Sequence, residues 1–247
     1  EEYNIYTKST ARDYGWSWTI PTQTRTGNGY VFSNKYINAE QAKQEMEEAY
    51  GQELEVREFE FNPGRLEHSW KGNVFAVGLA QSFVEPLEAT SIGNVIQSLA
   101  CFIHHLPSWN DDQCNKDIAN IFDNISDYIQ AHYLTTKENT PFWKEVKDNM
   151  VLSDTLKENL KKWKHRLPLA GDIKCNWGMF FAVNYIPILY GLKFFNIESI
   201  RREYGEYNPD NNIDLELKHI TDGTFWVSHK KMIKLLRDGI HYHLDEN

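Results

Sequence analysis

The stretch "VGLAQSFVEPLEATSIGNVIQSLACFI" (Val77–Ile103) decides the expected fold, because its hydrophobic periodicity changes within a few residues. A short apolar run ends at Gly78, a loop carries Glu85 and Glu88, and an apolar repeat with helical spacing follows. The members of the repeat are Ile92, Val95, Ile96, Leu99, Ile103 and Leu106. The stretch predicts a buried strand that leads through a short polar loop into a buried helix.

The loop has the composition of a helix start. Thr90 or Ser91 can cap the helix, whose first-turn N–H groups lack intrahelical acceptors. Their partial positive charge favours a nearby carboxylate, so Glu88 has an ordinary structural explanation beside a functional one. Pro86 fixes the approach of the chain. We interpret Glu85 as structural or solvent-facing.

The segments before the loop predict strands and one helix. Residues 14–36 predict a β-hairpin in which Trp16, Trp18 and Ile20 alternate and Asn28-Gly29 supplies the tight turn. The same part of the chain is also predicted to form one helix and two further strands. These are a helix from Asn38 to about Tyr50 with Gln41 completing a capping box, a strand over Glu55–Phe61, and a strand over Val74–Val77 that is covered on both faces.

Helical patterns fill the rest of the chain. Ile118–Tyr133 predicts a helix that Asp117 could cap, and further helices are expected over residues 153–165 and Lys230–Tyr242. Strands first and helices later indicate an α+β protein or the second half of an α/β protein.

The composition bounds the class of protein. Of the 247 residues 41% are hydrophobic, enough for a sizeable core, and the net charge of −9 disfavours nucleic acid as a partner. The basic run "KKWKHR" (Lys161–Arg166) is interpreted as a solvated helix face. Met179–Phe195 falls short of the ~20 apolar residues that a membrane span needs. We therefore expect no nucleic-acid partner and no membrane.

The cysteines and histidines give no recognisable metal or disulfide pattern. Three scattered cysteines, Cys101, Cys114 and Cys175, indicate a reducing, cytoplasmic location. His104-His105 and His241/His243 lack HExxH spacing, so no metal site is expected. The sequence leaves the oligomeric state open, a homo-oligomer included.

Four motifs, in register, resemble flavin-dependent halogenases of the tryptophan halogenase family. They are "GWSWTIP" (Gly15–Pro21), similar to WxWxIP; "NPGRLEHSW" (Asn62–Trp70); "GNVFAVGLAQSFVEPLEATSI" (Gly72–Ile92), similar to a segment ending in EPLEST; and "ISDYIQAHY" with "TPFW" (Ile125–Tyr133, Thr140–Trp143). Their order is kept over roughly residues 7–195, while the last part of the chain matches poorly.

The resemblance implies a flavin-monooxygenase-like α/β domain with a mostly helical substrate part. Residues 1–106 would belong to the FAD- and halide-binding domain and 107–247 to the helical substrate-side region. No GxGxxG loop occurs, and the family's catalytic lysine precedes WxWxIP. Both would lie in an upstream FAD-binding half of the same polypeptide.

The implied activity is halogenation of an electron-rich aromatic small molecule with an indole, phenol or pyrrole-like ring. Reduced FAD, O₂ and a halide ion (chloride, bromide or iodide) yield hypohalous acid for chlorination, bromination or iodination. A separate flavin reductase supplies the reduced flavin.

The resemblance also implies roles for individual residues. Glu88 would face the substrate ring, and the backbone amides of Thr90 and Ser91 would hold the halide. Leu79 and Ile92 would contact FAD. The signature residues Trp16 and Trp18, with Ile20 and Pro21, would lie between flavin and substrate.

A late aromatic segment, Asn176–Pro187, is the candidate substrate wall. Trp177, Phe180 and Phe181 could stack on an aromatic ring, and the alternative is a buried core helix. Ala89 replaces the family's usual serine, which bears on rate and on substrate range. The tail differs from that of tryptophan-specific enzymes, so free tryptophan is not assured.

Two other functions remain open from the sequence. One is a flavin-dependent hydroxylase of the same superfamily, recognised by an oxygenated product without a halide requirement. The other is a non-catalytic, truncated module that binds an aromatic ligand or a partner.

Overall fold

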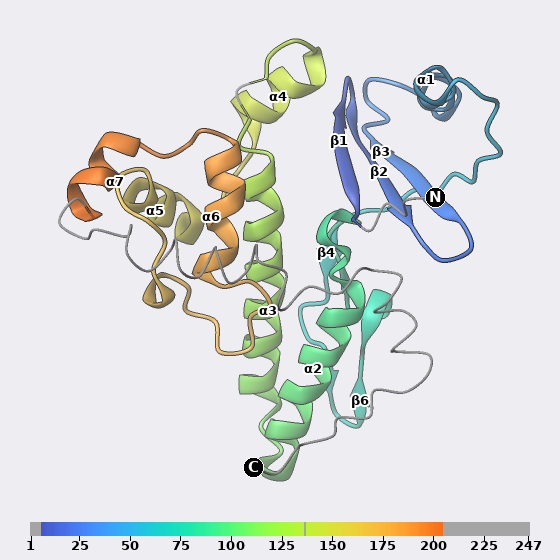
Figure 1. The fold of residues 1–247 in the computed structure, drawn as a ribbon. Coiled ribbons are helices and arrows are strands. Elements are labelled where there is room, and N and C mark those ends of the chain that lie inside the picture. Colours follow the sequence, from blue (N-terminus) through green and yellow to red (C-terminus); the bar gives the residue numbers. More distant parts are fainter. Residues whose placement is uncertain (1–5, 136, 205–247) are drawn as a thin grey trace, which may run out of the picture.

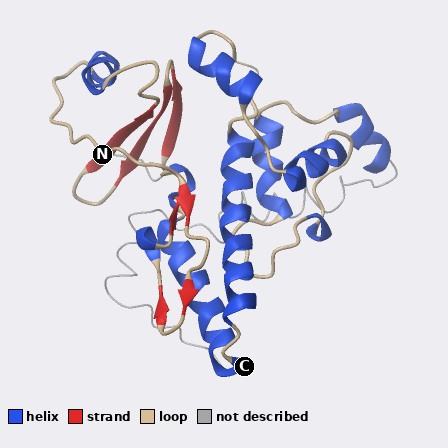
Figure 2. Cartoon of the chain, turned by 180° about the vertical axis from the view of Figure 1, so that it is seen from behind, coloured by secondary structure: helices blue, strands red, loops and turns tan. Residues whose placement is uncertain are grey.

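The structure is a computed structural model that describes residues 6–135 and 137–204. Strands occupy the first part of the described chain and helices the second (Figures 1 and 2), as the order of patterns predicted. The expected α+β arrangement is therefore confirmed. The helix predicted over Lys230–Tyr242 lies outside the described residues.

A three-stranded antiparallel sheet begins the fold. Its strands are β1 (Lys8–Arg12), β2 (Gly15–Pro21) and β3 (Thr26–Phe32), with β2 in the middle. The hairpin over residues 14–36 is confirmed as β2 and β3, and β1 is an additional strand that the pattern did not indicate.

The turn of this hairpin was predicted at the wrong place. It closes at Thr22, whose N–H donates to the Arg25 carbonyl at 2.8 Å. Asn28 and Gly29 lie inside β3, opposite Thr19 and Trp18. A Cβ on Gly29 would come within 2.4 Å of the Trp18 indole. This glycine therefore makes room for a ring rather than forming a turn.

Helix α1 (Ala39–Tyr50) forms as its capping signal predicted. The Asn38 side chain accepts the Gln41 N–H at 2.9 Å, and the Gln41 side chain accepts the Asn38 N–H at 3.0 Å. The helix ends at Gly51, which has the left-handed φ of 67°. Both ends of α1 are thus fixed by local sequence.

The strand predicted over Glu55–Phe61 is wrong, and the one predicted over Val74–Val77 is confirmed only at Val74–Phe75 and is not covered on both faces. Residues 55–61 are irregular, with Phe59 79% exposed, because no neighbouring strand pairs with them. Val74 is 65% exposed and belongs to a tight hairpin of two-residue strands. The short strands are β4 (Gly64–Arg65) with β7 (Ser82–Phe83), and β5 (Trp70–Lys71) with β6 (Val74–Phe75).

The second part of the chain is a helical assembly around the long helix α3 (Figure 1). The helices are α2 (Ser91–His105), α3 (Asp111–His132), α4 (Pro141–Asn149), α5 (Asp154–Trp163), α6 (Ala182–Gly191) and α7 (Ile197–Tyr204). The expected cap at Asp117 is wrong, because α3 begins earlier and the Asn110 side chain accepts the Gln113 N–H at 3.2 Å. The helix over residues 153–165 is confirmed as α5, with Ser153 as its cap.

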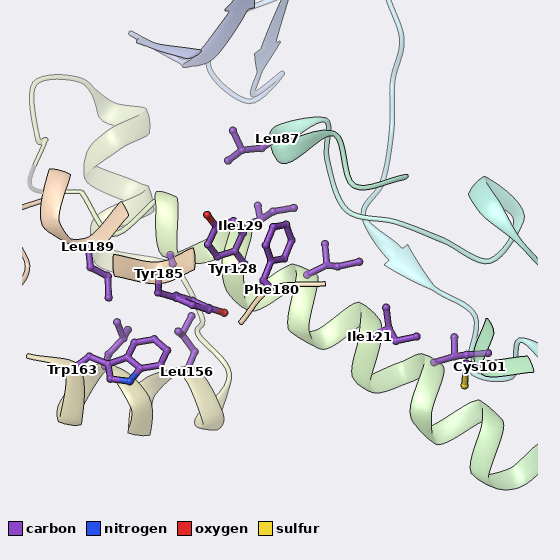
Figure 3. Packing of buried hydrophobic residues seen from close by; sticks show 14 of the residues in the cluster. Leu87, Cys101, Ile121, Tyr128, Ile129, Leu156, Trp163, Phe180, Tyr185 and Leu189 are labelled. Carbon is purple, nitrogen blue, oxygen red and sulfur yellow. The ribbon is translucent and has the colours of Figure 1, made fainter. Parts of the chain in front are cut away.

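The core lies between α3, α5 and α6. Tyr128, Trp163 and Tyr185 pack there with aliphatic side chains (Figure 3). Trp163 is fully buried and its indole N–H donates to Asp172 at 2.8 Å. Arg166 donates to both oxygens of Asp172, at 2.6 and 2.8 Å. The solvated-face interpretation of Lys161–Arg166 is therefore wrong for these two residues and right for its exposed lysines.

Helix α2 forms where predicted, but the expectation that its apolar stripe is buried is wrong. Ile92, Ile96 and Ile103 are 76%, 61% and 64% exposed. The face turned inward carries Asn94, Ser98, Cys101 and His105. Helical spacing fixes which residues share a face, whereas packing on α3 decides which face is covered. None of the described helices has the length and apolar character that crossing a bilayer requires.

Replacing Asp172 with asparagine is expected to lower the free energy of unfolding by about 2 kcal/mol at neutral pH. Arg166, Trp163 and the Leu169 N–H hold the pKa of the Asp172 carboxyl well below its ordinary 3.8. The ionised carboxylate therefore contributes its full stabilisation at pH values above 3.8. This contribution is lost as the pH falls from there through the lower pKa of the folded state. Urea unfolding followed by tryptophan fluorescence checks the difference.

The matched control is Asp154→Asn, because Asp154 is 97% exposed beside Lys157. It should change stability by less than about 0.5 kcal/mol. A loss in Asp172→Asn that is as large at pH 2 as at pH 7 would contradict the argument.

Candidate functional site

The loop before α2 is held in an unusual backbone conformation. It passes through the short 3-10 helices η1 (Gly78–Ala80) and η2 (Leu87–Ala89). Glu88 and Ala89 have φ values of 65° and 49°, in the left-handed region that costs non-glycine residues of order 1–3 kcal/mol each. Leu87 is buried and projects toward the end of α3 (Figure 3). This anchor, with Pro86 before it, fixes the direction of both loop acids.

Glu88 is paired with a histidine on the last turn of α3. Its Oε1 lies 3.1 Å from His132 Nε2, and His132 Nδ1 lies 2.9 Å from the Tyr128 carbonyl. A carbonyl oxygen can only accept, so Nδ1 carries a proton. The contact at Nε2 then needs a second proton, held either by the imidazole or by the Glu88 carboxyl. The pair is thus joined by one hydrogen bond that orients the carboxyl.

Glu85 is bound by the next residue of α3. The Tyr133 hydroxyl donates to the two Glu85 oxygens at 3.0 and 3.1 Å. Burial raises the pKa of the Glu85 carboxyl to about 7, against the lowering effects of Tyr133 and His132. The Tyr133 hydroxyl also faces the Trp16 indole. Of the two interpretations of Glu85, solvent-facing is wrong.

An aromatic stack lies beside the Glu88–His132 pair. The Tyr128 ring meets the His132 ring edge-on, with the ring centres 4.9 Å apart. It also stacks on Phe180, with the ring centres 3.9 Å apart (Figure 3). The Asn124 side chain accepts the N–H groups of Met179 and Phe180 and donates to the Phe180 carbonyl. A buried amide on α3 thereby holds Phe180 in place.

The other two candidates for the substrate wall lie elsewhere. Phe181 is 55% exposed, and Trp177 packs against His104 at 5.5 Å, near the far end of α2 from Glu88. The expected helix over this segment begins only at Ala182. Of the three aromatics predicted at the substrate, Phe180 is connected to Glu88 indirectly, through Tyr128 and His132, and it is itself buried.

The start of α2 presents the groups that the sequence indicated. Thr90 occupies the cap position and is buried, but its side chain makes no capping hydrogen bond. The first intrahelical bond runs from the Asn94 N–H to the Thr90 carbonyl at 2.8 Å. The N–H groups of Thr90, Ser91 and Ile92 precede it and have no acceptor within α2. The expected Thr90/Ser91 pair is therefore among the amides at this helix start.

Of the residues expected at the flavin, some are exposed and others are buried. Leu79 is 74% exposed, and η1, which carries it, contacts α2. Trp16 is buried in the same core cluster as Leu87, and Trp18 is only partly buried. Ile20 is 36% exposed toward the hairpin turn. The apolar surface of Leu79 and Ile92 beside free amides fits a flat ring with polar edges.

Sequence reasoning missed three members of this site. Tyr128, His132 and Tyr133 stand in "ISDYIQAHY", but the motif gave them no role. Spacing of four residues places Tyr128 and His132 on one helix face, and this signal could have linked them. Their contact with Glu85 and Glu88 joins residues 44 and 48 positions apart, which no local pattern reveals.

Comparison with known proteins identifies the family of this chain. The family model described as tryptophan halogenase matches residues 1–201. The chain is 34% identical to the tryptophan 6-halogenase SttH of Streptomyces toxytricini over 75% of this chain and 37% of that protein. It is 31% identical to the tryptophan 7-halogenase RebH of Lentzea aerocolonigenes over 76% of this chain and 39% of that protein. The chain belongs to the tryptophan halogenase family.

Solved structures agree with this assignment. The crystal structure of SttH matches with a TM-score of 0.69 over 76% of this chain and 38% of that one, at 32% identity. BrvH, a flavin-dependent halogenase from Brevundimonas sp. BAL3, matches with a TM-score of 0.79 over 96% and 49%, at 25% identity. The chain spans about two fifths of the length of the curated relatives it matches.

The Glu85→Gln variant is expected to remove a pH-dependent loss of stability. The folded protein holds the Glu85 proton up to about pH 7, whereas the unfolded chain releases it near pH 4.5. Wild-type stability therefore falls between these values by up to about 3 kcal/mol through this group. The glutamine carbonyl still accepts a hydrogen bond from the Tyr133 hydroxyl. The free energy of unfolding of the variant, relative to that of the wild type, should therefore rise from pH 4 to pH 8. Chemical unfolding across this range measures the gain.

An exposed acid provides the control. Glu60→Gln removes a carboxylate from an irregular surface segment and should follow the wild-type profile. A Glu85→Gln advantage that is the same at pH 4 and pH 8 would show that Glu85 ionises freely in the fold.

Proposed function

We propose that the protein containing this chain is a flavin-dependent halogenase acting on an electron-rich aromatic small molecule. The observation that carries the proposal is the Glu88–His132 pair, next to the first amides of α2 and to an aromatic stack that leads from His132 through Tyr128 to Phe180. The EPLEAT motif therefore has a partner that can hold its carboxylate in place.

Glu88 would bind the electrophile or accept the proton that the ring loses on substitution. His132 supports this role because it fixes the orientation of the carboxyl. Its own Nδ1 is fixed by the Tyr128 carbonyl. Glu88 is about one-third exposed, so a ligand can reach it from the side away from α3. This arrangement suits transfer of one proton from a cationic ring to a carboxylate.

The halide would bind at the start of α2. The expected donors are the amides of Thr90 and Ser91, whose N–H groups both precede the first intrahelical bond of α2. Amides carry no full charge, so they hold a halide without suppressing its nucleophilicity.

FAD would lie against Leu79 and Ile92, with the upstream half of the polypeptide covering its other side. When bound, reduced FAD with O₂ supplies the oxidising equivalent that turns the halide into hypohalous acid. A separate flavin reductase would provide the reduced cofactor. Trp16 and Trp18 would separate flavin from substrate, with Ile20 and Pro21 continuing that strand. The relatives' names make tryptophan one candidate in a panel of indoles, phenols and pyrroles.

Glu88→Gln in the full-length protein is expected to lower halogenated product by about 100-fold or more, because the amide cannot accept a proton. FAD binding should stay within about twofold, since Glu88 lies on the substrate side of the proposed arrangement. The assay combines FAD, a reductase, O₂ and chloride, bromide or iodide with an aromatic panel, and product masses report halogen incorporation.

Three outcomes would overturn the proposal. They are wild-type turnover in Glu88→Gln, an oxygenated product formed without halide, and no product from an enzyme that binds FAD. The second would identify a flavin hydroxylase and the third a non-catalytic module.

Ala89 substitutions separate backbone strain from side-chain chemistry. Ala89→Ser should keep or raise the halogenation rate, because the exposed side chain has room for a hydroxyl. Ala89→Gly should raise the free energy of unfolding by about 1 kcal/mol, since φ of 49° is unstrained for glycine. Turnover and urea unfolding of both variants test this. A collapse of turnover in Ala89→Ser would contradict the alignment of EPLEAT with EPLEST.

A further inference from the structure

The far end of α2 and the start of α3 bring together side chains that no function proposed above uses. Cys101 and His105 lie four residues apart on α2, and Cys114 and Asp117 lie three apart on α3. The turn η3 (Leu106–Ser108) connects the two helices here. These spacings place each pair on one face of its helix. Both faces meet at the α2–α3 contact, one of the most extensive in the fold.

The donor atoms converge closely. A Cys101 sulfur, a His105 ring nitrogen and an Asp117 oxygen all lie within 4.8 Å of one another. His105 Nε2 is 2.9 Å from Asp117 Oδ2. The Cys114 thiol lies next to that of Cys101 but outside this group of three. We propose that Cys101, His105, Cys114 and Asp117 form a binding site for one divalent transition-metal ion of the zinc class.

The donor chemistry selects that class. Two sulfurs, one imidazole nitrogen and one carboxylate oxygen make a four-membered set that suits a tetrahedral zinc ion. Calcium and magnesium prefer oxygen ligands alone, so this set discriminates against them. The ion would lie among Cys101, His105 and Asp117, replacing the direct His105–Asp117 hydrogen bond, and Cys114 would move toward it to complete the set.

Burial and support match a structural site. Both cysteines are fully buried and His105 is 8% exposed. Gln113 donates to the other Asp117 oxygen at 3.0 Å, which orients the carboxylate from outside the donor set. The metal bonds would close four positions from protein side chains alone, as in structural rather than catalytic zinc sites.

The packing of α2 gives an independent reason for a metal. This helix turns its polar face toward α3 while Ile96, Leu99 and Ile103 on the other face stay exposed. Buried polar side chains therefore lie at this contact beside the apolar side chains of Ile118 and Ile121. Metal bonds that cross-link α2 to α3 would add to the apolar packing there. Binding replaces the two thiol protons, and both pass to solvent as the ion is bound by thiolates.

Cobalt(II) titration of the full-length, reduced and chelator-treated protein tests the site. We expect saturation at one ion per chain, with thiolate-to-cobalt charge-transfer absorption and the visible bands of tetrahedral cobalt. Zinc should abolish these bands by displacement. Cys101→Ser and Cys114→Ser should each reduce the charge-transfer intensity to roughly half, because each removes one of two thiolates. Asp117→Asn keeps a polar partner for His105 and should weaken binding at least about 10-fold.

Cys175→Ser is the matched control. Cys175 lies close to the cluster, but its thiol donates to the Asn120 carbonyl at 3.5 Å and is not among the donors. This variant should bind cobalt like the wild type. The proposal is overturned if the wild type shows no charge-transfer band, if Cys175→Ser loses as much intensity as Cys101→Ser, or if folded Asp117→Asn binds cobalt unchanged. A Cys101–Cys114 disulfide that persists under the reducing conditions would overturn it as well.

Discussion

Glu85 and Glu88 are both fastened to the last turn of α3, one to Tyr133 and the other to His132. This double attachment constrains the rest of the region. The chain must turn sharply between the two acids, which accounts for the left-handed backbone at Glu88 and Ala89. Helix α2 begins directly after this turn, at Ser91. A loop without these contacts would have no reason to keep so strained a conformation.

The same helix supports the aromatic side of the site. Asn124, one turn before Tyr128, holds the backbone of Met179 and Phe180 with three hydrogen bonds, so the Phe180 ring stays stacked on Tyr128. α3 therefore serves both as the core of the helical part and as the scaffold of the candidate site. Side chains mounted on a packed helix keep their geometry better than side chains on loops.

Interactions between neighbouring residues could be predicted from the sequence, whereas contacts between distant segments could not. The capping box at Asn38 and the ends of α1 and α5 followed from adjacent residues, because a cap is a local hydrogen bond. The tight turn at Asn28-Gly29 was wrong, because Gly29 is required by the Trp18 ring across the sheet. The strand over Glu55–Phe61 was wrong since alternation forms a strand only when a neighbour pairs with it. The cluster of Cys101, His105 and Asp117 was missed, because its members lie on two different helices.

By itself, the sequence determined the family, the position of α2 and the identity of the acid at the loop before it. Four motifs in fixed order carry that information, and helical periodicity needs only a few neighbouring residues. Only the tertiary structure decided which face of α2 is covered, which residues hold Glu85 and Glu88, and which aromatic lies beside them. These are contacts between segments up to 56 positions apart, and their energy depends on packing that no local pattern encodes.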